Sequence, residues 1–241
     1  MSRWEILPYN DAQSLAVAAA SRWLDLLAAH HGERFCVALS GGRIARDLFI
    51  AVTEEAKARA TNLNGVEFFW GDERCVQPEH PESNFRAAAE LLLAPLGVRK
   101  NQVHRIKSET DADFGAAEAE AELCRITPLD PNGQPVLDLI FLGMGEDGHV
   151  ASLFPGEPDK DSTSTTVYRV VIGPKPPPVR ITLGYAAIAA AREVWVMASG
   201  AGKEEALRES LKPDGRTPLA HVLRARGHTT IFTDLPVPAS R

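Results

Sequence analysis

Short runs of β-branched and aromatic residues alternate along this chain with longer stretches rich in alanine and leucine. Such alternation is typical of strands joined by crossover helices, the arrangement that builds a parallel sheet. The apolar runs are nearly continuous, as strands covered on both faces require. We therefore predict an α/β fold of three layers, with a mainly parallel, doubly wound sheet and helices on both of its faces.

Six segments are predicted to be strands and six to be helices. The strands are Arg34 to Leu39, Val66 to Trp70, Leu137 to Leu142, Val167 to Ile172, Glu193 to Ala198 and Thr229 to Phe232. The helices are Asp11 to His31, Arg43 to Ala60, Asn84 to Leu93, Asp111 to Ile126, Tyr185 to Ala191 and Lys203 to Leu211. The proline-containing segments Pro128 to Pro135 and Pro174 to Pro178 are predicted to be loops, too short to separate domains. We expect a single domain over residues 1–241.

The acidic balance of the chain limits its partners. Its 241 residues carry a formal net charge of −6, and 44% are hydrophobic, an ordinary share for a globular protein with a full core. A negative net charge disfavours binding to nucleic acid and to anionic membranes unless cations gather locally. We expect neither partner, and an anionic small molecule would need a local basic pocket.

Cysteine content and hydropathy predict a cytoplasmic protein. Cys36, Cys75 and Cys124 are odd in number and widely spaced, which argues against a disulfide framework and against a cysteine zinc site. No stretch of about 18 apolar residues occurs, so neither a signal peptide nor a membrane span is predicted. We expect a monomer, because one domain with both sheet faces covered needs no partner to complete its core.

Candidate chemistry is sought where strands lead into helices, because ligands of open parallel sheets lie beyond the carboxyl ends of the strands. After the first predicted strand comes Ser40-Gly41-Gly42-Arg43. Two glycines there leave backbone N–H groups free to face an anion at the helix start, and Arg43 adds a positive charge. The alternative is a tight turn in which glycine only permits a positive φ.

The second strand ends in Trp70-Gly71-Asp72-Glu73-Arg74, followed by Ser83-Asn84 before a helix. Arg74 is a candidate phosphate ligand, and the acids Asp72 and Glu73 are candidates for orienting it or for contacting sugar hydroxyls. A solvated charge run that closes a strand explains the same residues equally well. Ser83 or Asn84 then only caps the next helix.

The third strand runs into the most informative segment, Gly143-Met144-Gly145-Glu146-Asp147-Gly148-His149. The three glycines let the backbone approach a ligand and aim N–H groups at developing negative charge. His149 is the natural proton acceptor, since a neutral imidazole can take a proton from water without a metal, and Asp147 is placed to orient it. No histidine here has metal-ligand spacing such as His-Glu-x-x-His, so no metal is expected.

Two further cations follow rigid or glycine-rich segments. Arg180 comes just after the run Pro176-Pro177-Pro178, which would hold it toward the pocket, and Lys203 ends Ser199-Gly200-Ala201-Gly202-Lys203 at another junction of strand and helix. Lys203 is placed like a phosphate contact, although an exposed helix-start lysine is the alternative. The Walker A spacing is absent, so nucleotide hydrolysis is not indicated.

These segments together resemble the 6-phosphogluconolactonases over nearly the whole chain. The resemblance rests on five blocks in the same order: Leu39 to Gly42, Trp70 to Arg74 with Ser83-Asn84, Leu142 to Gly156, Pro177 to Thr182, and Gly200 to Lys203. It implies a hydrolase of the oxidative pentose phosphate pathway that opens 6-phospho-D-glucono-1,5-lactone to 6-phosphogluconate without metal or cofactor. By the same resemblance His149 is the general base supported by Asp147, while Arg74, Arg180 and Lys203 hold the phosphate or polarise the lactone.

Two other functions stay open beside the lactonase. Glucosamine-6-phosphate deaminases share the glycine-rich loop with its histidine and a strand-end aspartate like Asp72, but they typically carry Phe-Asn-Glu-Pro where this chain has Ser152-Leu153-Phe154-Pro155. A sugar-phosphate-binding regulator without activity is the second alternative, because a fold does not fix a function. A serine-esterase mechanism is not expected, because no Gly-x-Ser-x-Gly elbow occurs and Ser152 is predicted to lie at a helix start.

Arg43 departs from the commonest family pattern, in which Ser-Thr-Pro often follows the glycine pair. We predict that this arginine replaces a lost hydroxyl contact with charge. Arg43→Ser is then expected to change the KM for the phosphorylated substrate. Steady-state kinetics of the variant check this, and an unchanged KM would count against contact between Arg43 and the phosphate.

Overall fold

The computed structural model describes residues 4–31, 34–109, 111–156 and 164–236. Its main sheet has six strands in the order β1-β9-β8-β5-β2-β3, and every neighbouring pair is parallel. The strands are β1 (Glu5–Pro8), β2 (Phe35–Leu39), β3 (Val66–Trp70), β5 (Leu139–Gly143), β8 (Glu193–Ala198) and β9 (Thr230–Thr233). The predicted mainly parallel α/β sheet is confirmed.

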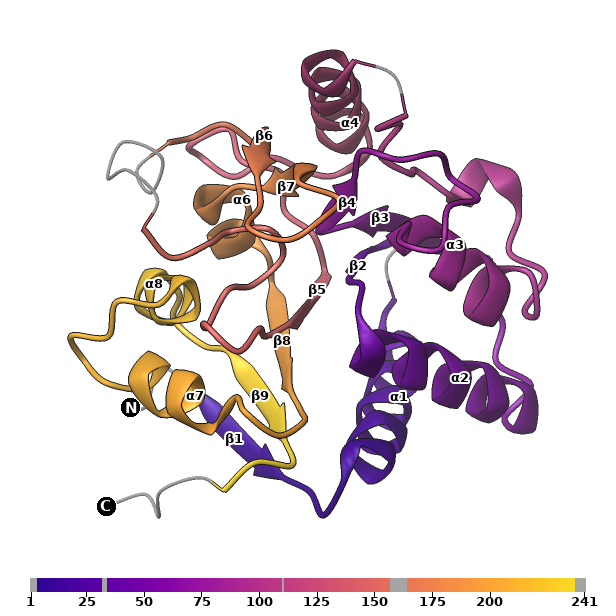
Figure 1. Ribbon diagram of the computed structural model, residues 1–241. Helices are drawn as coiled ribbons and strands as arrows, with labels where there is room; N and C mark the ends of the chain where they lie inside the picture. Colours follow the sequence, from indigo (N-terminus) through magenta and orange to yellow (C-terminus); the bar gives the residue numbers. More distant parts are fainter. Residues whose placement is uncertain (1–3, 32–33, 110, 157–163, 237–241) are drawn as a thin grey trace.

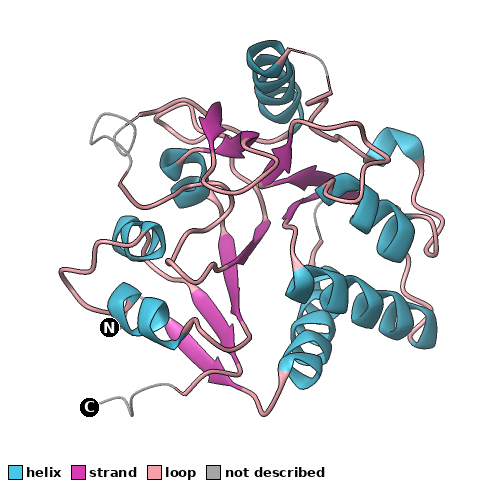
Figure 2. Cartoon of the chain, in the orientation of Figure 1, coloured by secondary structure: helices cyan, strands magenta, loops and turns pink. Residues whose placement is uncertain are grey.

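Helices form the layers on either side of this sheet (Figures 1 and 2). Helices α1 (Ala12–Ala29) and α2 (Arg43–Ala58) pack against each other on one side. On the other side lie α6 (Tyr185–Ala190), α7 (Glu204–Ser210) and α8 (Pro218–Ala225). Helix α8 was not predicted, although the sequence carries two signals for it, the cap Thr217 and a proline at its first position.

The interior explains why the apolar runs are continuous. All five residues of β2 are buried, as are Val194 to Ala198 in β8. Trp23 of α1 meets Phe68 of β3 and Phe141 of β5 edge-on, so a helix of one outer layer is anchored on the sheet. The contiguous hydrophobic core contains residues from five of the six strands, and residues of β1 pack against it.

A second, smaller sheet has no counterpart in the sequence prediction. It contains β4 (Asp72–Arg74), β7 (Val179–Leu183) and β6 (Tyr168–Ile172), in that order and antiparallel. The segment Val167 to Ile172 is a strand, but its expected place in the parallel sheet was wrong. β6 turns back through the proline loop directly into β7, and a short connection of this kind can only join antiparallel strands.

The remaining helices cover this second sheet and the edge strand β3. Helix α4 (Ala112–Ile126) packs on β6 and β7. The predicted helix Asn84 to Leu93 begins as α3 (Asn84–Ala88) and continues as the π-helical turn η1 (Ala89–Leu93), and a short 3₁₀ turn η2 (Lys100–Gln102) follows. No helix in the described ranges is long and apolar enough to cross a bilayer.

One buried arginine, at the end of α8, connects the end of α6 with the segment that leads into β9. Arg226 Nη1 donates to the carbonyls of Ile188, Ala189 and Ala191 at 2.8–2.9 Å, where the helix leaves its last carbonyls unpaired. Its Nε donates to the carbonyl of His228. Burial lowers the pKa of Arg226 to about 10, so the group is still charged at neutral pH.

Arg226→Met should therefore destabilise the protein, because it leaves several buried carbonyls without a donor. We expect a loss of about 3 kcal/mol in the free energy of unfolding, measured by urea denaturation. Arg208→Met removes an arginine from an exposed ion pair with Glu205 and serves as the control. Its effect should stay below about 1 kcal/mol; equal losses in the two variants would contradict this role for Arg226.

Candidate active site

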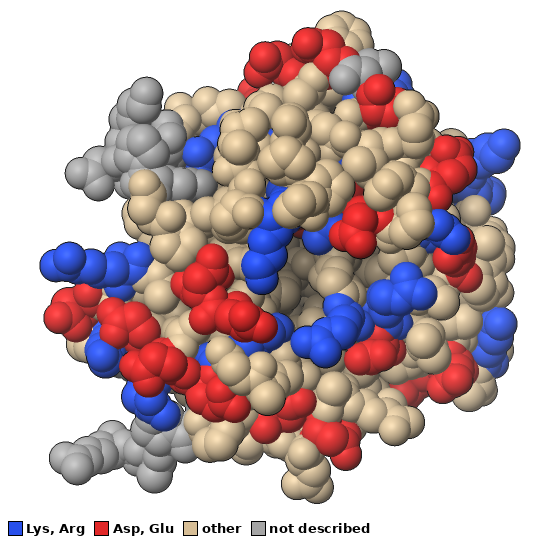
Figure 3. Space-filling view, viewed as in Figure 1, with Lys and Arg blue, Asp and Glu red and all other residues tan. Residues whose placement is uncertain are grey.

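The cavity that contains the predicted residues lies at the carboxyl ends of the parallel strands. Strand β2 is followed by β3 on one side, whereas its other neighbour β5 is followed by β8 on the opposite side, so the direction in which successive strands are added to the sheet reverses between β2 and β5. Such a switch point is where open α/β sheets bind ligands. The cavity measures about 500 Å³, and Figure 3 shows the hollow with Lys and Arg side chains around it.

The structure brings almost all predicted site residues together. The cavity is lined by Gly41, Gly42, Arg43, Asp72, Arg74, His149, Arg180 and Lys203. Asp147 is not on the wall but lies directly behind His149, whose ring it contacts. The walls come from both sheets, since Asp72 and Arg74 belong to β4 and Arg180 belongs to β7.

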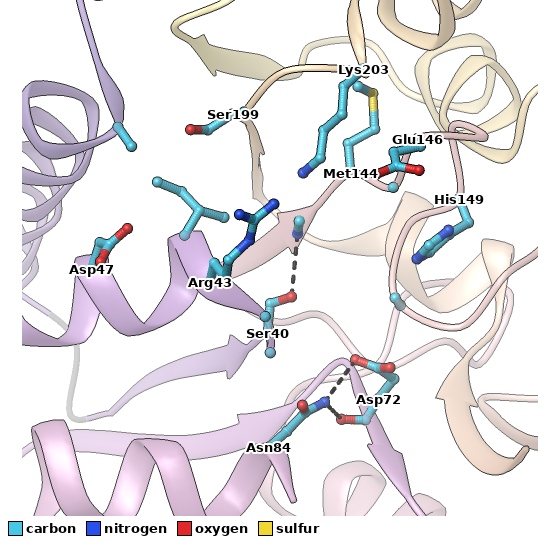
Figure 4. A pocket seen from close by; sticks show the side chains of 18 of the residues that line it. Ser40, Arg43, Asp47, Asp72, Asn84, Met144, Glu146, His149, Ser199 and Lys203 are labelled. Carbon is cyan, nitrogen blue, oxygen red and sulfur yellow. Dashed lines mark hydrogen bonds between the residues drawn. The ribbon is translucent and has the colours of Figure 1, made fainter. Parts of the chain in front are cut away.

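The glycine pair after β2 is required by close packing as well as by backbone conformation. A Cβ atom on Gly41 would lie 1.8 Å from Oδ1 of Asn84, and Gly42 has φ +90°. Ser40 Oγ accepts a hydrogen bond from the N–H of Gly143 at 3.2 Å (Figure 4). The loops after β2 and β5 are thereby tied together at the base of the cavity.

Arg43 and Lys203 form a cation pair at one end of the cavity. Arg43 is the first residue of α2, whose N-terminus carries no side-chain cap, and its guanidinium reaches toward Gly200 of the loop after β8. Lys203 points toward Arg43 from that loop (Figure 4). Burial, followed by the charge of Arg43, lowers the pKa of Lys203. An uncapped helix start with two cations is suited to a phosphate.

Asp72 is a buried carboxylate on the cavity floor. Its Oδ2 accepts a hydrogen bond from Ser152 Oγ at 2.6 Å, and its Oδ1 accepts one from Asn84 Nδ2 at 3.2 Å. The backbone N–H of Ser152 in turn donates to Thr182 Oγ1 of β7. Ser152 lies in a turn, so its predicted place at a helix start was wrong; its hydroxyl donates to Asp72 and is buried.

Glu73, the neighbour of Asp72, stabilises the start of α3. Its buried carboxylate accepts hydrogen bonds from the backbone N–H groups of Asn84 and Phe85 and from Ser83 Oγ. Burial raises its pKa, although the backbone hydrogen bonds act in the opposite direction. Glu73 therefore fixes Asn84 in place and does not line the cavity.

Arg74 and Arg180 form a second cation pair, one more tightly bound by the protein. Arg74 Nη1 donates to the carbonyl of Glu82 at 2.7 Å. Arg180 Nε and Nη2 donate to the carbonyls of Pro177 and Lys175, as the predicted rigid proline segment suggested, and its guanidinium lies 5.4 Å from the ring of Phe154. Burial, then the charge of Arg74, lowers the pKa of Arg180.

His149 faces the cavity with its ring held from behind. Nδ1 lies 2.5 Å from Asp147 Oδ1, which also accepts the backbone N–H of His149. Burial alone would raise the pKa of Asp147, but the hydrogen bonds from His149 outweigh it and lower the pKa. Because a carboxylate can only accept, Nδ1 carries the proton and Nε2 of the neutral ring is left as an acceptor.

The three glycines of this loop do not present the N–H groups expected of them. The N–H of Gly143 donates to Ser40, that of Gly145 to the carbonyl of His149, and that of Gly148 to the carbonyl of Gly145. These glycines instead allow close packing, since a Cβ on Gly145 would lie 2.1 Å from the His149 ring. The expectation that they aim at developing negative charge was wrong.

Several residues that line the cavity were not predicted as site residues from the sequence. They are Asp47, Glu146, Lys175, Ser199 and Asp234, together with Asn84, which was expected only as a helix cap. Asp234 follows β9 and accepts from Ser199 Oγ at 2.7 Å and from the N–H of Gly200. The rule that selected other strand ends applies equally to β9. Within the described residues, no group of three or more metal-ligating side chains could hold an ion.

Comparison with known proteins agrees with this geometry. The family model described as glucosamine-6-phosphate isomerases/6-phosphogluconolactonase matches residues 10–231. The chain belongs to this family. It is 34% identical over 219 residues to the 6-phosphogluconolactonase of Streptomyces coelicolor, an overlap of 88% of this chain and 84% of that protein.

Two further similarities cover most of both chains. The 6-phosphogluconolactonase of Mycobacterium tuberculosis is 35% identical, over 86% of this chain and 85% of its own. The solved structure of 6-phosphogluconolactonase from Trypanosoma brucei superposes with a TM-score of 0.86 at 27% identity, covering 97% of each chain. The resemblance inferred from the five sequence blocks is confirmed.

The proximity of Arg43 and Lys203 predicts a measurable coupling. A neighbouring positive charge disfavours protonated lysine, so Arg43→Ser should raise the pKa of Lys203. Titration of the lysine side chain by NMR in the two proteins checks the direction. Arg46→Ser changes an exposed residue one turn further along α2 and is the control, so the pKa of Lys203 should not change in it. If the pKa of Lys203 is also unchanged in Arg43→Ser, the two cations do not interact.

Proposed function

We propose that this chain hydrolyses 6-phospho-D-glucono-1,5-lactone to 6-phosphogluconate. The observation that carries the proposal is one cavity that contains an oriented histidine and, apart from it, a pair of cationic side chains at a helix start. A lactone is an activated ester, so its hydrolysis needs a base for water, a place for negative charge and a means of positioning. The relatives that are named 6-phosphogluconolactonases support this choice of substrate.

His149 is the proposed general base. With Nδ1 bonded to Asp147, its Nε2 accepts a proton from a water that attacks the lactone carbonyl. Asp147 holds the ring in this tautomer and stabilises the imidazolium that forms. Ser152 is not the nucleophile in this scheme, because its hydroxyl is buried and bonded to Asp72.

The substrate phosphate is assigned to Arg43, Lys203 and the N-terminus of α2. A phosphate dianion next to His149 would favour the protonated ring, which is useless as a base, so the phosphate must sit apart. Arg74 is engaged with Glu82 and Arg180 with backbone carbonyls, whereas no ion pair is formed by Arg43 or Lys203 within the described residues. The structure thus favours one division of roles among the four cations that the sequence left open.

Arg180 is assigned to the lactone end, where it would polarise the carbonyl. Phe154 connects it with the base, since the ring centroid of Phe154 lies 5.0 Å from that of His149 and 5.4 Å from the guanidinium of Arg180. Nη1 of Arg180 has no hydrogen-bond partner among the described residues. A donor on a largely buried side chain stabilises a developing oxyanion more than a fully solvated one would.

The deciding experiment is hydrolysis of freshly generated lactone in the presence of a chelator, coupled to 6-phosphogluconate dehydrogenase. His149→Ala should lower kcat by about 10²- to 10⁴-fold, the usual share of a general base. His221→Ala, which lies in α8 away from the cavity, is the matched control. Absence of acceleration by the wild type over the spontaneous rate would reject the lactonase and direct attention to a deaminase assay.

Remote phosphate binding also predicts how the enzyme discriminates substrates. Unphosphorylated gluconolactone should lose kcat as well as affinity, because binding energy from the phosphate positions the carbonyl against the water. Comparison of kcat and KM for the two lactones measures this. Equal kcat/KM values would contradict the scheme.

The single domain, the monomeric state and the cytoplasmic location stay predictions.

A further inference from the structure

A second cavity, of about 820 Å³, opens between the π-helical turn η1 and helix α4. It has no lining residue in common with the active-site cavity. Its walls come from η1, the segment that follows it, and α4, with β3, α3 and β6 contributing one residue each. The proposed lactonase activity leaves this cavity unexplained.

The interior of the second cavity is apolar and largely aromatic. Phe69, Phe85 and Tyr168 line it together with Leu93, Val98 and Val103. The aromatic groups are fixed by their own contacts, because Phe69 stacks on His104 at 4.7 Å between centroids and Tyr168 Oη donates to the carbonyl of Trp70 at 2.6 Å. Preformed aromatic walls favour a flat, unsaturated ligand that stacks on them.

The rim of the second cavity is cationic. It carries Lys100, Arg105, Lys107 and Arg125 together with the two carboxylates Glu118 and Glu122, and Arg105 forms an ion pair with Glu109. Lys107 pairs with Glu118 and Arg125 with Glu122, both in exposed positions where ion pairs contribute little and an incoming anion can compete. Lys100 is exposed and makes no ion pair within the described residues. The rim therefore complements a negative charge.

We propose that the second cavity binds a flat aromatic small molecule bearing one anionic group, at a site separate from the active site. The ring system lies among Phe85, Tyr168 and Leu93, and the anionic group lies at the rim beside Lys100. The aromatic half of this ligand does not suit the active site, whose cavity walls are mostly polar loops.

The probe for this test is 8-anilinonaphthalene-1-sulfonate, whose fluorescence rises on binding, titrated into the folded protein with the active site saturated by 6-phosphogluconate. We expect one saturable site. Lys100→Glu should weaken binding about tenfold, and Ala119→Trp, which fills the cavity from α4, should abolish it. The neutral analogue N-phenyl-1-naphthylamine should bind more weakly than the sulfonate.

Three controls make the result decisive. Lys212→Glu reverses an exposed charge on the α7 side and should bind the probe like the wild type. Lys203→Ala should also leave binding unchanged, because Lys203 belongs to the other cavity. Lactonase rates of Lys100→Glu and Ala119→Trp should match the wild type, which shows that they fold. The proposal is overturned by absence of saturable binding, by equal affinity in Lys100→Glu and Lys212→Glu, or by binding that occurs only when 6-phosphogluconate is left out.

Discussion

The buried carboxylate of Asp72 joins the parts of the chain that make the active site. It stands in the second sheet, yet it accepts hydrogen bonds from Ser152 in the loop after β5 and from Asn84 at the start of α3. Asn84 in turn occupies the space that Gly41 leaves beside it. Burying a carboxylate costs free energy unless hydrogen-bond donors surround it. Asp72 therefore fixes the positions of both the loop after β5 and the start of α3.

Electrostatics then divides the cavity into two ends. The protein carries a net charge of −6, but five Lys and Arg side chains line one hollow (Figure 3). Arg74 and Arg180 are held by carbonyls and by Glu82, whereas Arg43 and Lys203 repel each other with no carboxylate bonded to either in the described residues. Repulsion between these two cations is relieved when an anion binds, which makes that end a natural place for phosphate.

The antiparallel sheet is what turns an open switch point into a cavity. Without β4 and β7, the loops after β2, β5 and β8 would form a shallow edge. The second sheet brings Asp72 and Arg180 opposite these loops, and the proline segment before β7 supplies the carbonyls that orient the arginine. Helix α4 covers the same sheet from outside, and this leaves the second, apolar cavity between α4 and η1.

The sequence by itself determined the parallel sheet, most of its alternating helices and eight of the residues that line the cavity, because strand periodicity and strand-end motifs are local signals. It did not determine that Val167 to Ile172 leaves the main sheet, or that the short strands at Asp72 and Val179 pair, because strand pairing is decided by contacts distant in the chain. For the same reason only the tertiary structure showed that the N–H groups of the loop glycines donate to groups of the protein itself and that Ser152 donates a hydrogen bond to Asp72. It also showed that Arg43 lies beside Lys203. Those relations depend on distances between separate loops, which no single segment encodes.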